Sequence, residues 1–324
     1  MFKKIKEFLC GGGGNTSSDI EKCYKKFYNS NRYITDAEII RRYLVHHQSI
    51  YIKWFSLLLT PFLAIKLFFS SKNNKLIFPQ LCFYVSFHCN LHCESCHALM
   101  EYSELKNPDI KVFINDLEIL FNTVDYIYTI SLTGGEPFLN RDLGIFIEYL
   151  FENYGNQFKR IAIPTNGTVK PDQNTLIVLK KFNDRIDIDI SNYGDKSTKI
   201  IPVFEKFEID YTLEDYDNEW FDTGEPISKN RGKDELKKLF WNCGENNSCN
   251  NIFNGEFHLC AKSACGTNFN LIPKNEKFYY NLRSNDSYEI KKESIKRIKD
   301  LDYNISCNYC DFSLKKGKKR KGDI

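Results

Sequence analysis

Three cysteines spaced C-x3-C-x2-C constrain this chain more than any other stretch of its sequence. Cys89, Cys93 and Cys96 follow the apolar run 81–87 within one short loop. Three thiolates from one loop can hold three irons of a [4Fe–4S] cluster. Because no fourth protein ligand is offered nearby, one iron would stay open to a chelating co-substrate. Zinc is the alternative, since closely spaced cysteine and histidine also form tetrahedral sites and histidines lie within reach of the triplet.

A glycine-rich motif after a later β-like run favours iron over zinc. The motif is Gly134-Gly135-Glu136-Pro137, and it follows the run 126–132. Together with the cysteine triplet it resembles the radical S-adenosylmethionine (SAM) enzymes, over about residues 81–213. The resemblance implies that the triplet binds the cluster, that SAM chelates the open iron, and that the glycine-rich strand end hydrogen-bonds the SAM amino group. Glycine suits this contact because backbone can approach the ligand with no Cβ in the way.

The pattern after residue 80 alternates between strand-like and helical runs. Short strands rich in Val, Ile and Tyr, joined by helices of about ten or more residues, predict right-handed crossovers and a parallel sheet. The resemblance implies an α/β fold, a partial (β/α)6 barrel, with cluster and SAM at the C-terminal ends of the strands. The expected strands are 81–87, 126–132, 158–164, 185–191 and 207–213, and the expected helices are 108–122, 140–153, 171–182 and 195–206.

Polar residues at two further strand ends are candidate SAM contacts. Thr165 and Asn166 follow the third expected strand, and Ser191 ends the fourth. The resemblance implies that Ser191 holds the SAM ribose, whereas a cap on the next helix is the alternative. Asn166 and its following glycine could equally form a tight turn. Ser95 departs from the family, in which the residue before the third cysteine is often aromatic and contacts adenine. No catalytic residue is assigned, and Arg231 is expected either to contact substrate or to lie at the surface.

A second group of cysteines occupies the last quarter of the chain. Asn254-Gly255 predicts a type I′ hairpin there, which would place Cys249 opposite Cys260. The spacing C-x11-G-x4-C, then C-x2-C, resembles the twitch domain, the shorter relative of the SPASM domain, which houses one auxiliary [4Fe–4S] cluster. The resemblance implies that four cysteines are its ligands, with Cys249 as the alternative to the first of them and a structural zinc as the alternative metal. These four are Cys243, Cys260, Cys307 and Cys310.

Composition limits the compartment and the partners. Twelve cysteines, without the pattern of a cleavable signal peptide, indicate a reduced, cytoplasmic setting. The net charge of +3 comes from the basic end of the chain, so the body has no nucleic-acid-binding stripe. The apolar window 50–69 contains two lysines and a proline. We expect it to pack against the enzyme, with an interfacial or spanning helix as alternatives, so peripheral membrane contact stays open.

These patterns predict the following segments: a helical N-terminal extension at 1–78, the radical SAM core at 79–215, a linker at 216–242, a twitch/SPASM-like domain at 243–312 and a basic disordered tail at 313–324.

The resemblance also implies a reaction. A flavodoxin or ferredoxin would supply an electron, SAM would be cleaved to a 5′-deoxyadenosyl radical, and the radical would abstract hydrogen from a substrate. A small polar molecule such as a sugar or aminocyclitol is expected, in a net oxidation that uses the auxiliary cluster. Maturation of a ribosomally made peptide is the alternative, although residues 1–75 lack a strand-rich leader-binding pattern. A non-catalytic iron–sulfur electron carrier is the alternative from another class.

Overall fold

The computed structural model describes residues 60, 63–67, 74–93, 95–214, 222–243, 245 and 249–314. The chain forms two compact units, Met1–Asn74 and Lys75–Ile324. In the first unit the described residues 60 and 63–67 are helical, and most of the predicted helical extension lies outside the described residues. The basic tail beyond residue 314 also lies outside them. Within the described ranges, no helix has both the length and the apolar character needed to cross a membrane.

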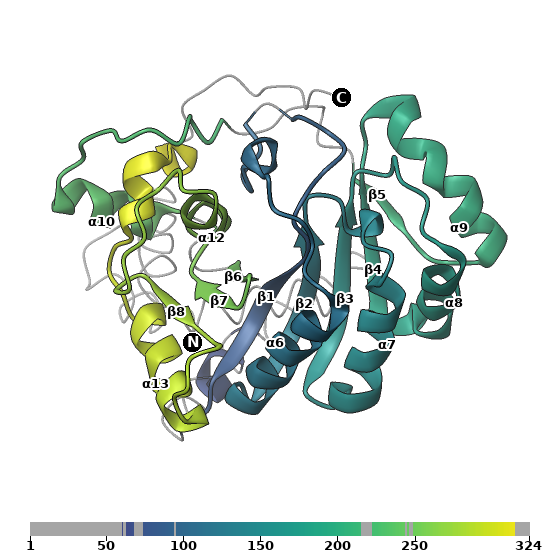
Figure 1. The fold of residues 1–324 in the computed structure, drawn as a ribbon, viewed down its shortest axis with the longest axis horizontal. Coiled ribbons are helices and arrows are strands. Elements are labelled where there is room, and N and C mark those ends of the chain that lie inside the picture. Colours follow the sequence, from purple (N-terminus) through teal and green to yellow (C-terminus); the bar gives the residue numbers. More distant parts are fainter. Residues whose placement is uncertain are drawn as a thin grey trace, which may run out of the picture. The chain divides into compact units, whose positions relative to one another are not determined.

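An eight-stranded sheet organises the unit Lys75–Ile324 (Figure 1). Its strand order is β5-β4-β3-β2-β1-β6-β7-β8. The strands from β5 to β6 are parallel, whereas β7 and β8 are antiparallel to their neighbours. The strands are β1 (Ile77–Ser86), β2 (Tyr126–Gly134), β3 (Phe158–Thr165), β4 (Ile186–Ser191), β5 (Thr212–Glu214), β6 (Asn250–Phe253), β7 (Glu256–His258) and β8 (Tyr279–Asn281).

Helices connect the parallel strands and pack beside them (Figure 1). The α-helices are α6 (Ile110–Thr123), α7 (Leu143–Tyr154), α8 (Gln173–Lys181), α9 (Ile201–Phe207), α10 (Lys233–Asn242), α12 (Ala261–Asn268) and α13 (Tyr288–Lys299). Short 3-10 helices lie at Met100–Tyr102, Pro137–Leu139, Asn183–Arg185, Gly194–Ile200, Ile305–Tyr309 and Phe312–Leu314. The alternation of strand and helix from β1 to β5 confirms the predicted α/β fold with a parallel sheet.

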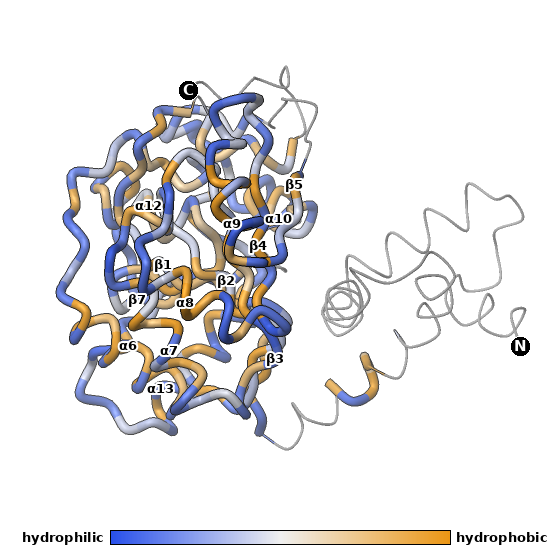
Figure 2. The backbone as a smooth tube through the Cα atoms, turned by 90° about the vertical axis from the view of Figure 1, so that its right-hand side faces the viewer, coloured by the Kyte–Doolittle hydropathy of each residue, from blue (hydrophilic) through white to orange (hydrophobic). Residues whose placement is uncertain are grey.

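Local sequence explains where these elements begin and how they pack. The side chains of Asp109, Asp172 and Ser287 accept hydrogen bonds from backbone N–H groups in the first turns of α6, α8 and α13, which satisfies otherwise unpaired donors. β1 is buried along almost its whole length, as expected for a central parallel strand covered on both faces. In Figure 2, hydrophobic segments lie at α6 and α7, whereas hydrophilic segments occupy connecting loops.

The fifth predicted strand is shorter than expected. The sequence predicted 207–213, but α9 continues to Phe207 and Glu208 ends it in the left-handed conformation with φ 52°. The N–H of Ile209 then bonds back to Phe204 O at 2.9 Å, which is the geometry of a helix C-terminus. Only Thr212–Glu214 remains to pair with β4.

The predicted hairpin at Asn254-Gly255 is confirmed, with both residues at positive φ. Its first strand, β6, pairs in parallel with β1, so the hairpin extends the core sheet, and one hydrophobic core runs from Leu76 to Ile298. The predicted domain boundaries stay predictions, because residues 75–324 form a single compact unit. The last part of the expected linker 216–242 forms the helix α10.

Candidate functional site

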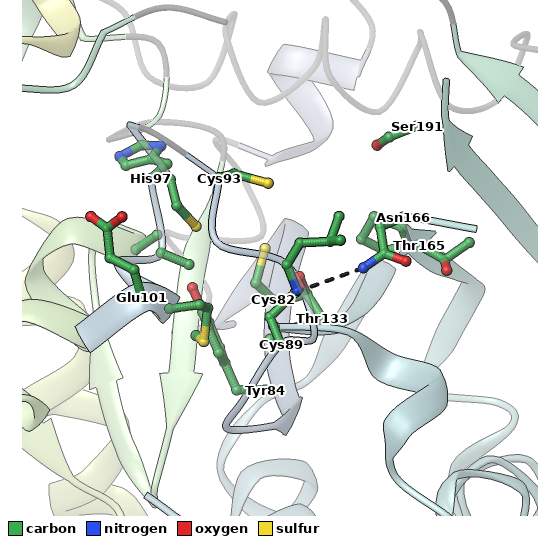
Figure 3. Close-up of a pocket in the computed structure, with 18 of the residues that line it drawn as sticks. Cys82, Tyr84, Cys89, Cys93, His97, Glu101, Thr133, Thr165, Asn166 and Ser191 are labelled. Carbon is green, nitrogen blue, oxygen red and sulfur yellow. Dashed lines mark hydrogen bonds between the residues drawn. The ribbon is translucent and has the colours of Figure 1, made fainter. Parts of the chain in front are cut away.

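A cavity of about 250 Å³ lies where the C-terminal ends of β1 to β4 meet (Figure 3). In the view of Figure 3, Cys89 lies centrally, His97 and Glu101 lie on one side, and Asn166 and Ser191 lie on the other. The cavity brings together most of the residues predicted for the cluster and SAM, while Glu136 and Pro137 are not among its lining. The predicted residues that line it are Cys89, Cys93, Cys96, Gly134, Gly135, Thr165, Asn166 and Ser191.

The cysteine loop is held by consecutive turns. Cys96 N–H bonds Cys93 O at 3.2 Å, and Leu99 N–H bonds Cys96 O at 3.0 Å. Ser95 and Leu99 take positive φ values of 62° and 54°, a strained conformation for these residues that turns the chain sharply. Ser95, which departs from the family pattern, donates to Asp222 Oδ1 at 3.0 Å. The loop is therefore tied to the segment before α10.

Buried N–H groups point at the cysteine sulfurs. Leu91 N–H lies 3.4 Å from Cys89 Sγ, and the Asn166 amide nitrogen lies 3.7 Å from the same sulfur. Burial raises the pKa of the Cys89 and Cys96 thiols, although backbone N–H groups act in the opposite direction. Thiolate ligands must lose their protons to bind a metal, so these donors favour the form that a cluster needs.

Gly134 and Gly135 are required by the packing of the end of β2 against the cysteine loop. A Cβ on Gly134 would lie 1.9 Å from Ser86 O, and one on Gly135 would lie 2.0 Å from His88 O. The backbone N–H of Gly135 bonds Ser86 O, and that of Glu136 bonds His88 O, each at 3.1 Å. The motif thus fixes the loop that carries the first cysteine, a role that the sequence did not predict. The predicted contact with SAM stays a prediction.

Glu136 is fully buried and joins the ends of β2 and β3. It accepts hydrogen bonds from Phe138 N (3.1 Å), Thr165 Oγ1 (2.8 Å) and Asn166 N (2.8 Å). Burial raises the pKa of this carboxyl to about 7, although the three hydrogen bonds favour the charged form. The arrangement gives Glu136 a supporting position rather than one in the cavity lining.

Asn166 and Ser191 lie at the ends of the next two strands and have different roles. Asn166 donates to Asn90 Oδ1 at 3.0 Å, and Gly167 follows it with φ 71°, so the turn predicted here is present and also supports the cysteine loop. Ser191 does not cap the next 3-10 helix, because the cap residue is Tyr193 and no side chain caps it. Ser191 instead lines the cavity, with the Tyr193 phenol in hydrogen-bonding reach.

The second cysteine group forms a separate, smaller cavity. Four thiols line it, together with His97 and Lys262. Burial raises the pKa of Cys260 to about 11, and neighbouring Cys310 adds to the increase. The four are Cys243, Cys260, Cys307 and Cys310, the set implied by the twitch resemblance.

Cys249 is placed elsewhere. It lines the larger cavity, and its Sγ lies 2.7 Å from Cys82 Sγ on β1. The sequence left Cys249 and Cys243 as alternatives for the first ligand, and the structure puts Cys243 in the cavity of the other three. Within the described ranges, no three His, Cys, Asp or Glu side chains are gathered as closely as a single bound ion requires. A tetrahedral zinc holds its thiolates within about 4 Å of one another.

Arg231 clamps the turn that carries the last two cysteines. Its Nη1 donates to Cys307 O and to Cys310 O, each at 2.6 Å, and its Nη2 pairs with Asp311. The side chain is 7% exposed, so Arg231 is neither a surface residue nor part of the larger cavity lining. The local sequence did not predict this role, because the partners of Arg231 lie about eighty residues further along the chain.

His97, one of the histidines that the sequence offered for a zinc site, lines both cavities. Its ring stacks on Phe312 with centroids 5.0 Å apart, and its Nδ1 lies 4.0 Å from Glu245 Oε2. Burial lowers the pKa of His97 to about 4, so the ring is neutral near pH 7. The residue directly after Cys96 therefore reaches the wall of the second cavity.

Known proteins resemble this chain in its core. The Radical SAM superfamily model matches residues 83–216. GTP 3′,8-cyclase 3 of Mycobacterium bovis and of Mycobacterium tuberculosis are each 32% identical over 89 residues, which cover 26% of this chain and 23% of the relative. The chain therefore spans about a quarter of the length of these relatives.

Solved structures are similar at low identity. BtrN in complex with AdoMet and 2-DOIA has a TM-score of 0.45 and 19% identity, covering 73% of this chain and 94% of that one. Native anSMEcpe with AdoMet and the Cp18Cys peptide gives 0.44 and 15%, covering 75% and 90%. Streptococcus suis SuiB bound to its precursor peptide SuiA gives 0.40 and 16%, covering 83% and 76%.

The family match spans the cysteine loop and the glycine-rich strand end, which the structure brings to one cavity. The match implies a [4Fe–4S] cluster and SAM, and one loop with a buried and two half-buried cysteines suits that cluster. Residues 83–216, which hold the cysteine loop and the glycine-rich strand end, therefore match the Radical SAM superfamily.

Proposed function

We propose that this protein reductively cleaves SAM and uses the resulting 5′-deoxyadenosyl radical to abstract hydrogen from a small polar substrate. The observation that carries the proposal is the single cavity lined by the cysteine triplet and by Gly134, Gly135 and Ser191. When bound, the cluster would supply the electron that breaks the SAM sulfonium bond. The remaining work falls to the protein.

The protein's own residues would bind, orient and exclude water. Cys89, Cys93 and Cys96 would hold the cluster, and the Asn166 amide would steady Cys89 through its contact with the sulfur. Gly134 and Gly135 line the cavity beside the cysteine loop, and Thr165, Asn166 and Ser191 would offer polar groups to SAM. Apolar lining residues such as Leu91, Ala98 and Met100 would keep water away from a reactive carbon radical.

The second cavity supports the proposal of an auxiliary [4Fe–4S] cluster, which Cys243, Cys260, Cys307 and Cys310 would hold. With all its irons ligated by protein, such a cluster has no open position for substrate, and what it offers is its reduction potential. It would then accept the second electron of the substrate. A net oxidation follows, of a sugar or aminocyclitol type of molecule.

The names of the matching relatives favour a small polar substrate. The matching relatives are GTP cyclases by name, and GTP is small and polar. Peptide maturation is the second candidate, and a non-catalytic electron carrier is the third. The same proposal includes a flavodoxin or ferredoxin as reductant, a cytoplasmic location and peripheral membrane contact.

The experiment is an iron and sulfide count after anaerobic reconstitution. Wild-type protein should hold about eight irons, and a variant with Cys89, Cys93 and Cys96 all changed to Ala should hold about four. A wild-type protein that stays at about four irons and retains zinc would overturn the auxiliary-cluster part of the proposal. It would leave the SAM-cleaving part to be judged separately.

A further inference from the structure

Lys262 is a buried cation in the wall of the second cavity. It is the second residue of α12, directly after the turn that carries Cys260, and it is 1% exposed. Its Nζ donates to Gly224 O at 2.9 Å and to Thr223 Oγ1 at 3.3 Å. These two contacts fix the ammonium group beside the four thiols that line the cavity.

The two acceptors are neutral, so they satisfy hydrogen bonds without balancing the charge. No ion pair between described residues includes Lys262, whereas nearby Lys229 pairs with Asp311 at 3.7 Å. A buried charge is costly unless an opposite charge compensates it. The thiols of Cys310, Cys260 and Cys96 act electrostatically on Lys262, and as thiolates they would supply the missing negative charge. Glu245 also lines this cavity, but its carboxylate lies 4.0 Å from His97 Nδ1, and no ion pair between described residues joins it to Lys262. An anionic group bound in the cavity would therefore compensate the ammonium charge.

We propose that Lys262 is the counter-charge of the auxiliary cluster and raises the cluster's reduction potential. The inference rests on the proposed function, because it needs a cluster on Cys243, Cys260, Cys307 and Cys310. A [4Fe–4S] cluster with four thiolates is negative and becomes more so when it takes up an electron. A fixed cation beside it stabilises the reduced form more than the oxidised form. Solvent screens the interaction weakly at a buried site, so the charge suits the cluster to accept an electron from substrate.

The test measures the auxiliary cluster by itself. In a chain with Cys89, Cys93 and Cys96 changed to Ala, the midpoint potential would be followed by an EPR-monitored redox titration. Lys262→Met keeps the length of the side chain and removes its charge, so the potential should move to more negative values. Lys262→Arg keeps the charge and should stay closer to the parent. Lys237→Met is the matched control, because Lys237 is exposed and already paired with Asp302, and it should leave the potential unchanged.

Each outcome has a meaning. An unchanged potential in Lys262→Met with a full cluster overturns the inference. Loss of the cluster from Lys262→Met, but not from Lys262→Arg, supports it, because charge is then what retains the cluster. Loss from both variants overturns it, because side-chain fit rather than charge would then be required. A parent chain that binds no iron after reconstitution would instead defeat the proposed auxiliary cluster.

Discussion

At the scale of single residues, Gly135 shows how closely the glycine-rich strand end is packed against the cysteine loop. Because a Cβ there would lie 2.0 Å from a backbone oxygen, Gly135→Ala should push the loop away from β2. We expect the variant to lose about four irons, the content of the SAM-binding cluster. Gly232→Ala is the control, since nothing lies within 4 Å of a Cβ at that position, and it should keep its iron. Equal iron in both variants would show that the loop tolerates the displacement.

Glu136 predicts a pH dependence of stability. Its pKa is about 7 in the folded protein, against an ordinary value of 4.5. The folded state therefore holds the proton more tightly, and this contribution to stability is complete below pH 4.5 and is lost as pH rises through 7. The loss should reach about 3 kcal/mol. Urea unfolding of the apoprotein between pH 5 and about 8 should show a steeper decline for wild type than for Glu136→Gln. Parallel curves would contradict the assignment.

Two cysteines separate the proposed ligand set from its alternative. Cys260→Ala should lose the auxiliary cluster, about four irons, because Cys260 lines the cavity of the four thiols. Cys249→Ala should keep all its iron, because its sulfur contacts Cys82 in the other cavity. Iron analysis of both reconstituted variants decides the matter. Iron loss from Cys249→Ala alone would restore Cys249 as a ligand.

At the scale of elements, periodicity predicted most of the core because local sequence determines it there. The runs 126–132 and 158–164 became β2 and β3 with small extensions, since buried parallel strands need continuous apolar residues. The strand predicted at 207–213 begins only at Thr212. The end of α9 depends on the left-handed conformation of Glu208, which composition does not reveal. The hairpin was predictable from Asn254-Gly255, but its pairing with β1 was not, since that contact joins residues far apart in sequence.

Arg231 joins the segment before α10 to the turn that carries the last two cysteines. Arg231→Met removes two charged hydrogen bonds to part-buried carbonyl oxygens and leaves Asp311 without this partner. We expect a loss of about 2–4 kcal/mol in unfolding free energy, and faster removal of the auxiliary iron by a chelator. Lys237→Met, at an exposed ion pair on α10, should change neither. A chelation rate like wild type would show that the turn holds its shape without Arg231.

At the scale of the whole molecule, the sheet that carries the proposed SAM site continues into the part that carries the second cysteine group. The sequence predicted both cysteine groups and the fold of the core, because each depends on the spacing of residues that lie close together in the sequence. It did not predict that His97 would line both cavities, or that Lys262 would be buried with no ion pair to any described acidic residue, because both depend on tertiary packing. Tertiary packing also places Cys249 and Cys243 in different cavities. The cysteine spacing alone had left both as candidates for the first ligand.

The central claim is that the cysteine triplet and the cavity around it cleave SAM reductively. The most direct measurement is the amount of 5′-deoxyadenosine formed from SAM by anaerobically reconstituted, chemically reduced protein, with the variant in which Cys89, Cys93 and Cys96 are all Ala as control. We expect 5′-deoxyadenosine from wild type and none above background from the control, even though the control keeps its auxiliary iron. A wild-type protein with both clusters loaded and reduced that forms no 5′-deoxyadenosine would contradict the account and favour an electron carrier.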